Sequence, residues 1–156
     1  MSNENVRRSV ARVMIATGFQ PPAGPAMTAE TTTKAAYPYD THLDIRYGSG
    51  EVIDVPALVA ACTHPWYNQT LCRVNESVVR LGVVQGEYHW HKHDDEDEFF
   101  HVVSGRFLID LEDRTVDLAP GQGFVVPRGV MHRPRAPERT VILMVEGAGI
   151  VPTGDA

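Results

Sequence analysis

Cysteine and basic residues are both scarce in this chain of 156 residues. Its two cysteines, Cys62 and Cys72, cannot form the disulfide framework that stabilises many small secreted domains, so we expect reduced thiols and a cytoplasmic location. Lys and Arg together number 14, against 20 Asp and Glu, which gives a net charge of −6. Because phosphate binding depends on clustered cations, this balance disfavours a nucleic-acid partner.

Long apolar runs are also missing. A membrane-spanning helix needs roughly 18 consecutive apolar residues, and the N-terminal run is interrupted by Arg12, so neither a membrane helix nor a secretory signal is predicted. Residues 20–34 are rich in Pro, Ala and Thr and cannot bury enough apolar surface to offset the entropy of ordering. We therefore expect a flexible N-terminal arm over residues 1–36 and a single domain over residues 37–156.

The domain is expected to begin with one helix and to continue as strands. Asp54 can cap a helix with Pro56 in its first turn, which predicts a short helix over about residues 55–62. After this helix, Val, Ile, Leu and Phe occur in short runs separated by Gly, Pro and Asp. This pattern predicts an all-β domain, an antiparallel sandwich or barrel over about residues 70–151, on which residues 37–69 pack as strand and helix.

The segment HWHKHDDEDEFFH, which starts at His89, holds four of the seven histidines of the chain. Successive side chains on a strand point to opposite faces, so His89, His91 and His93 are expected to share one face. The acidic residues 94–97 would then form a solvated hairpin turn, and the returning strand would begin at Glu98 and bring a carboxylate back opposite the histidines. Imidazoles and a carboxylate on a rigid hairpin are ligands that a divalent first-row metal prefers.

This segment resembles the first motif of the cupin family, in which H-x-H is followed by Glu and then by Gly. The later segment GQGFVVPRGVMHRPRA resembles the second cupin motif, which contains Gly, Pro-x-Gly and a closing His. The two motifs lie within residues 86–136, and the strand pattern around them extends the resemblance over about residues 70–151. The resemblance is to small single-domain cupins of the RmlC-like and mannose-6-phosphate isomerase-like groups. The matching positions are His91, His93, Glu98 and Gly105 in the first motif and Gly121, Pro127, Gly129 and His132 in the second.

The resemblance implies a double-stranded β-helix, or jelly roll, with a metal near the middle of the barrel. It also implies one divalent transition metal ion per chain, bound by His91, His93, Glu98 and His132. Three imidazoles and one carboxylate leave open positions on a six-coordinate ion for a small-molecule substrate, oxygen or both. Iron(II) is the favoured ion, and manganese, nickel and zinc are the alternatives.

Three functions remain open at this point. The first is an iron(II)-type enzyme that activates oxygen or a bound substrate. The second is a redox-neutral isomerase, epimerase or lyase in which His89 is the candidate acid/base, although His89 is also explained as a supporting or wall residue. The third is a non-catalytic small-molecule binder or sensor. Arg80 interrupts an apolar run and either binds an anionic substrate or lies at an edge with its guanidinium in water.

Strand alternation also predicts which side chains face away from the metal. Tyr88 is expected on the face opposite to the histidine ligands, and His101 is expected to face away from Glu98, toward a surface or an interface. The segment 37–47 contains strand-forming residues without an obvious partner in the motif region. Because an open sheet edge must be protected, we expect a homodimer in which this segment pairs across to the other subunit.

Overall fold

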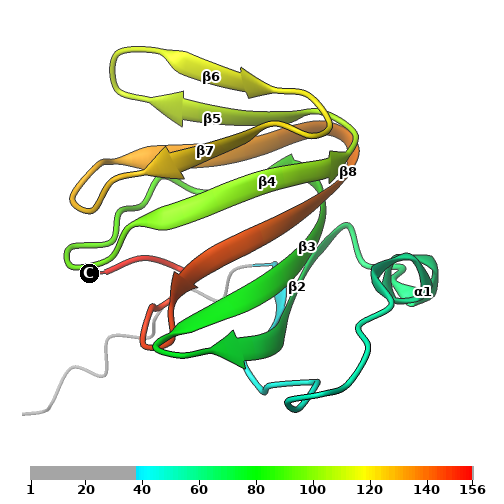
Figure 1. Cartoon of the computed structure of the whole chain (residues 1–156). Coiled ribbons are helices and arrows are strands. Elements are labelled where there is room, and N and C mark those ends of the chain that lie inside the picture. Colours follow the sequence, from blue (N-terminus) through cyan, green and yellow to red (C-terminus); the bar gives the residue numbers. More distant parts are fainter. Residues whose placement is uncertain (1–37, 156) are drawn as a thin grey trace, which may run out of the picture. The chain divides into compact units, whose positions relative to one another are not determined.

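A computed structural model of the protein describes residues 38–155, so the predicted arm over residues 1–36 lies outside the described part (Figure 1). Within that part the predicted all-β fold is confirmed, with one short helix. The elements in chain order are β1 (Asp40–His42), α1 (Val55–Ala61), β2 (Trp66–Val74), β3 (Ser77–Glu87), β4 (Glu98–Ser104), β5 (Phe107–Leu111), β6 (Thr115–Leu118), β7 (Gly123–Val126) and β8 (His132–Gly147).

The strands form a jelly roll that is organised around the long strand β8. The hydrogen-bonded order is β1-β2-β3-β8-β4-β7, and β5 pairs with both β6 and β8. The first residues of β8 pair with β5, and its later residues pair with β3 and β4 (Figure 1). Strand β8 therefore pairs with β3, β4 and β5. These pairings bring the ends of β3, β4 and β8 around a common interior.

The interior is filled mainly by apolar side chains that alternate with outward-facing ones. On β4, Phe100 and Val102 are buried, whereas Phe99 and His101 are only half-buried. Phe100 lies opposite Met144 of β8 in the strand register. Burying one large apolar side chain contributes about 1.5–3 kcal/mol. The interior cluster comprises Trp66, Val84, Tyr88, Phe100, Val102, Phe107, Ile109, Leu118, Val126, Ala136, Ile142 and Met144.

Helix α1 covers the outer side of the β2-β3-β8 part of the sheet. Asp54 Oδ1 accepts a hydrogen bond from the backbone N–H of Ala57 at 3.0 Å, so the predicted N-cap is confirmed. Leu58 and Val59 of α1 pack against a second apolar cluster that includes Leu71 and Leu81. No helix within residues 38–155 is long and apolar enough to cross a membrane.

Strand β1 gives the predicted strand-forming segment a partner within its own chain. Asp40, Thr41 and His42 pair in parallel with residues 67–69 of β2. In the expected homodimer, the β1–β2 pairing within one chain would be replaced by the same pairing between two subunits. The homodimer stays a prediction.

The loop between β3 and β4 differs from the predicted hairpin. β3 ends at Glu87 and β4 begins at Glu98, so the histidines do not lie on a continuous strand. Only His91 makes a strand-like contact in this loop, an isolated antiparallel bridge to His132. Tyr88 is buried in the interior cluster, so its predicted outward orientation is wrong. The physical reason is that side chains alternate only where the backbone is extended and paired.

Candidate metal centre

Three backbone segments bring the four candidate ligands together. His91 and His93 lie on the loop after β3, Glu98 is the first residue of β4, and His132 is the first residue of β8. The loop is fixed to the start of β8 by two backbone hydrogen bonds, from His91 N to His132 O at 3.0 Å and from His132 N to His91 O at 2.8 Å. A third hydrogen bond, from Gly129 N to His93 O at 2.6 Å, holds the second motif against the first.

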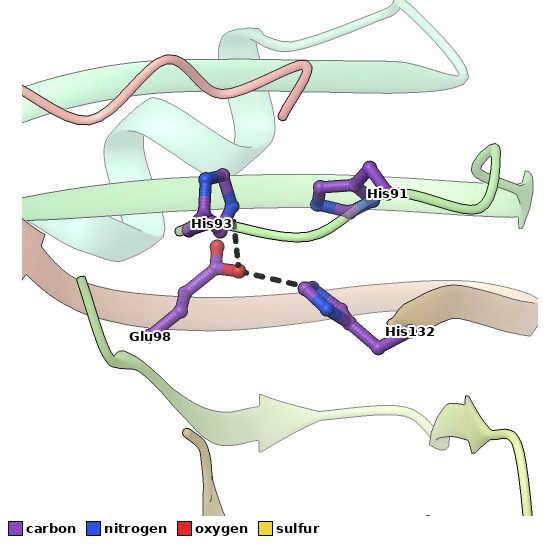
Figure 2. Close-up of side chains that lie close together, drawn as sticks. All are labelled: His91, His93, Glu98 and His132. Carbon is purple, nitrogen blue, oxygen red and sulfur yellow. Dashed lines mark hydrogen bonds and ion pairs between the residues drawn. The ribbon is translucent and has the colours of Figure 1, made fainter. Parts of the chain in front are cut away.

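The four side chains point toward one another in the interior (Figure 2). Their potential ligand atoms all lie within 4.8 Å of one another. Glu98 Oε2 lies 3.3 Å from His132 Nε2 and 3.5 Å from His93 Nε2. All four residues are buried, with relative exposures of 7% or less.

Backbone carbonyls set the tautomers of two of the histidines. His91 Nδ1 lies 3.1 Å from the carbonyl oxygen of His89, and His132 Nδ1 lies 3.0 Å from that of Val130. A carbonyl oxygen only accepts hydrogen bonds, so each Nδ1 carries a proton, and Nε2 is the ring nitrogen that faces the other candidate ligands. This is the outer hydrogen bonding that orients histidine ligands in metal sites.

Electrostatics keep this cluster in a form ready to bind a cation. Burial and, as the next cause, the nearby His132 lower the pKa of His91 to about 3, so this imidazole is neutral at pH 7. Burial opposes ionisation of Glu98, but the imidazoles of His132 and His93 outweigh it and lower the pKa of Glu98 to about 2. The site therefore offers the neutral imidazole of His91 and the carboxylate of Glu98 in the protonation states that metal ligands require.

His93 supplies the observation that tests whether a metal fits. Both of its ring nitrogens are buried, and neither has a hydrogen-bond partner within the described residues. A buried polar atom without a partner is costly, and a cation between His93 and Glu98 would satisfy the ring. Ligands about 2.1 Å from one ion lie at most about 4.2 Å apart, so donors within 4.8 Å need only a small contraction. The residues therefore fit one divalent transition metal ion.

A small cavity adjoins the candidate metal centre inside the barrel. Its volume is about 30 Å³. Two ligands, His91 and Glu98, form part of its wall. The rest of the wall is mainly apolar and also contains three polar side chains from β2, β3 and β8; the further residues are Trp66, Asn68, Arg80, Val84, Tyr88, Phe100, Phe107, Pro134, Ile142, Met144, Glu146 and Pro152.

Arg80 and Glu146 form a buried ion pair in this wall. Arg80 has a relative exposure of 4%, and β3 lies between β2 and β8, so the hypothesis of an edge position in water is wrong. Arg80 Nε contacts Glu146 Oε1. Burial and the nearby Glu98 raise the pKa of Glu146 above its usual range, although its ion-pair partner Arg80 acts in the opposite direction. Glu146 and Asn68 were not singled out in the sequence, where neither belongs to a motif.

The C-terminal segment after β8 supports the loop that carries the ligands. Figure 1 shows this segment running back toward the loop before β4. Asp155 N donates to Lys92 O at 3.0 Å, and Asp94 N donates to Asp155 Oδ2 at 2.7 Å. Gly154 has a φ of +84°, and a Cβ at this position would lie 2.6 Å from the Cβ of His91. The C-terminal segment therefore packs directly on one of the ligand residues.

His89 and His101 lie outside the cluster of four. His89 is half-buried beside it: its Nε2 lies 2.8 Å from Thr153 O and its Nδ1 lies 3.3 Å from the hydroxyl of Tyr39. His89 is not among the described residues that line the cavity. His101 is half-buried on the side of β4 that faces away from the cavity, as alternation predicts.

Comparison with known proteins agrees with this architecture. Residues 78–146 match the family described as Cupin domain. The uncharacterised protein YdbB of Bacillus subtilis (strain 168) is 45% identical over 80 residues, which cover 51% of this chain and 71% of YdbB. A solved structure of a cupin-2 domain protein from Shewanella frigidimarina is 32% identical with a TM-score of 0.59, covering 62% of this chain and 94% of that one.

A second solved structure, of protein NMB1881 from Neisseria meningitidis, is 28% identical with a TM-score of 0.56. The match covers 62% of this chain and 99% of the Neisseria chain. The shared barrel, the two motifs and the buried cluster of three histidines and one glutamate lead to one conclusion: the chain belongs to the cupin family and is a small single-domain cupin.

Proposed function

We propose that this cupin is a metal-dependent enzyme that acts on a small anionic or chelating organic substrate, in the manner of an iron(II) dioxygenase. The observation that carries the proposal is that the candidate metal centre opens on a cavity. The ligands His91 and Glu98 form part of its wall, which is otherwise mainly apolar. A bound iron(II) ion would supply open coordination positions for substrate and redox chemistry toward oxygen.

The protein's own residues prepare this cavity in two ways. Trp66, Phe100 and Met144 exclude bulk water and offer few protic groups that would quench a reactive intermediate. Charges inside such a dry cavity interact more strongly than they would in water. The backbone carbonyls of His89 and Val130 hold the rings of two ligands in one orientation, so the positions left open by the ligands face a defined direction.

A redox-neutral isomerase, epimerase or lyase is the alternative, and it requires a base that reaches the substrate. His89 is the candidate base, but its Nε2 faces the carbonyl oxygen of Thr153 and therefore donates a hydrogen bond to it. Its Nδ1 lies near the hydroxyl of Tyr39. Because this ring does not line the cavity, the arrangement favours the oxidative hypothesis over a role for His89 as the catalytic base.

The test is turnover of a substrate panel by protein loaded with iron(II) or with zinc, with and without oxygen. The oxidative proposal predicts oxygen consumption by the iron form, no turnover by the zinc form, and a modest effect of His89→Ala. The redox-neutral alternative predicts anaerobic turnover by the zinc form and a loss of about 10²-fold in His89→Ala, the typical contribution of a general base. Sustained anaerobic turnover by the zinc form would overturn the oxidative proposal.

A third outcome would indicate a binder or sensor. If metal-loaded protein binds a member of the panel tightly and never transforms it, with or without oxygen, the metal serves to fix a ligand. The same measurements therefore separate all three functions.

A further inference from the structure

We propose that Arg80 anchors the carboxylate group of a small monocarboxylate in the cavity beside the candidate metal centre. This inference rests on the proposed function and names the class of substrate that the same cavity would take. Arg80 comes from β3, whereas the metal-ligand motifs begin after that strand has ended. The anchor would therefore be a separate part of the binding site.

Arg80 is a buried charge whose hydrogen bonds are only partly satisfied by the described residues. A guanidinium group carries five N–H donors and is always charged in proteins. Arg80 Nε contacts Glu146, but Nη1 is buried and has no hydrogen-bond partner within the described residues. A buried charge is costly unless its hydrogen bonds are satisfied, so a missing acceptor at Nη1 indicates a ligand.

The position of Arg80 places it within reach of a molecule bound in the cavity. Arg80 and the candidate ligands His91 and Glu98 line the same cavity, so a molecule that enters it meets the guanidinium and the metal ligands together. Gly82, two residues after Arg80, packs closely against two residues of the cavity wall, Ile142 and Asn68. A Cβ at Gly82 would lie 2.7 Å from Ile142 Cγ1 and 3.2 Å from Asn68 Oδ1.

The shape of the guanidinium, the acidic wall and the size of the cavity together select the chemical class of the ligand. A planar guanidinium matches the two oxygens of a carboxylate, which gives short, charge-assisted hydrogen bonds. Glu98 and Glu146 are also in the wall, so a dianion such as phosphate would meet two carboxyl groups at close range. A space of about 30 Å³ admits only a few heavy atoms. A short monocarboxylate satisfies all three conditions.

The experiment compares acids with their neutral isosteres by titration calorimetry on the full chain. Acetate and propionate are the probes, and acetamide and propionamide are the matched neutral controls. Each is titrated into metal-loaded and into metal-free protein. We expect saturable binding of the carboxylates at least tenfold stronger than that of the amides, with a preference that persists in the metal-free protein.

The variants assign this preference to Arg80. Arg80→Met combined with Glu146→Gln removes both members of the ion pair, so neither charge is left buried alone. Because Glu146 lies near the metal ligand Glu98, the double variant is compared with wild type in the metal-free form. We expect it to lose the preference for carboxylates by at least tenfold. Arg73→Met on β2 removes an exposed positive charge from the neighbouring strand and should leave the preference unchanged. If the double variant does not fold, Arg80→Lys, which keeps the charge without the planar fork, should still weaken carboxylate binding.

Two results would overturn the proposal. One is wild-type protein that fails to prefer carboxylates over amides, because this comparison needs no variant. The other is undiminished carboxylate preference in the double variant, or in Arg80→Lys if that variant is the one that folds. Failure of the metal-dependent function would be visible separately as absence of bound metal or of turnover, and the metal-free titration would still decide the role of Arg80.

Discussion

Replacing Gly154 by alanine is expected to weaken metal binding, although Gly154 is not itself a ligand. The added Cβ would lie 2.6 Å from the Cβ of His91 and 3.1 Å from the carbonyl oxygen of Lys92. Carbon atoms pack at about 3.5–4.0 Å, so the loop or the C-terminal segment must move by roughly 1 Å. Metal–ligand distances tolerate only about 0.2 Å. We therefore expect at least a tenfold weaker metal affinity, which corresponds to about 1.4 kcal/mol.

The backbone cost of the substitution must be separated from this contact. Gly154 has a φ of +84°, in the left-handed region where a side chain costs about 1–2 kcal/mol. Gly50 has a φ of +87°, and no atom lies within 4 Å of the position that its Cβ would take. Gly50→Ala is thus a matched control that carries the same backbone cost without touching the ligand loop.

Competition with a chelator of known affinity measures the metal dissociation constant of each variant, and urea unfolding measures its stability. Both variants should lose a similar amount of stability from the backbone, and only Gly154→Ala should bind metal more weakly. Equal metal affinity in the two variants would refute the inference that the C-terminal segment positions His91.

Three further predictions concern stability and assembly. Hydrogen bonds from Arg135 and Arg133 hold the pKa of Asp110 below its usual range, so Asp110→Asn should cost roughly 2 kcal/mol near pH 7. The pKa of Asp110 in the folded protein lies below the unfolded value of about 3.9, so its stabilising contribution is present above that pH and is lost as pH falls below it. In urea unfolding from pH 7 to pH 3, the free energies of unfolding of wild type and Asp110→Asn should therefore converge. Asp54→Ala should lower the free energy of unfolding by about 1 kcal/mol through loss of the α1 N-cap while leaving metal content unchanged. Light scattering should give the mass of a homodimer; a mass near that of the 17.2 kDa monomer would contradict it.

The sequence predicts the metal centre better than it predicts the cavity beside it. His91, His93, Glu98 and His132 belong to motifs whose spacing is visible in one chain, and the structure brings all four together. The short helix after Asp54 is likewise set by local capping chemistry.

Features that depend on long-range register are not visible in the sequence. In the sequence, Arg80 has two explanations, because an arginine in an apolar run lies either at a sheet edge or in the barrel interior. The pairing of Arg80 with Met144 of β8 is the long-range contact that excludes the edge position. The outward orientation predicted for Tyr88 fails because the loop after Glu87 is not an extended strand. The contact of Gly154 with His91 joins residues that no motif connects.

The measurement that tests the account most directly is metal content by elemental analysis of purified wild-type protein and single alanine variants. We expect one divalent transition metal ion per wild-type chain and strongly reduced metal in His91→Ala, His93→Ala, Glu98→Ala and His132→Ala. His101→Ala and Asp95→Ala are the controls and should keep nearly all of it, because neither residue belongs to the cluster. Full metal content with unchanged affinity in His132→Ala would contradict the proposed centre.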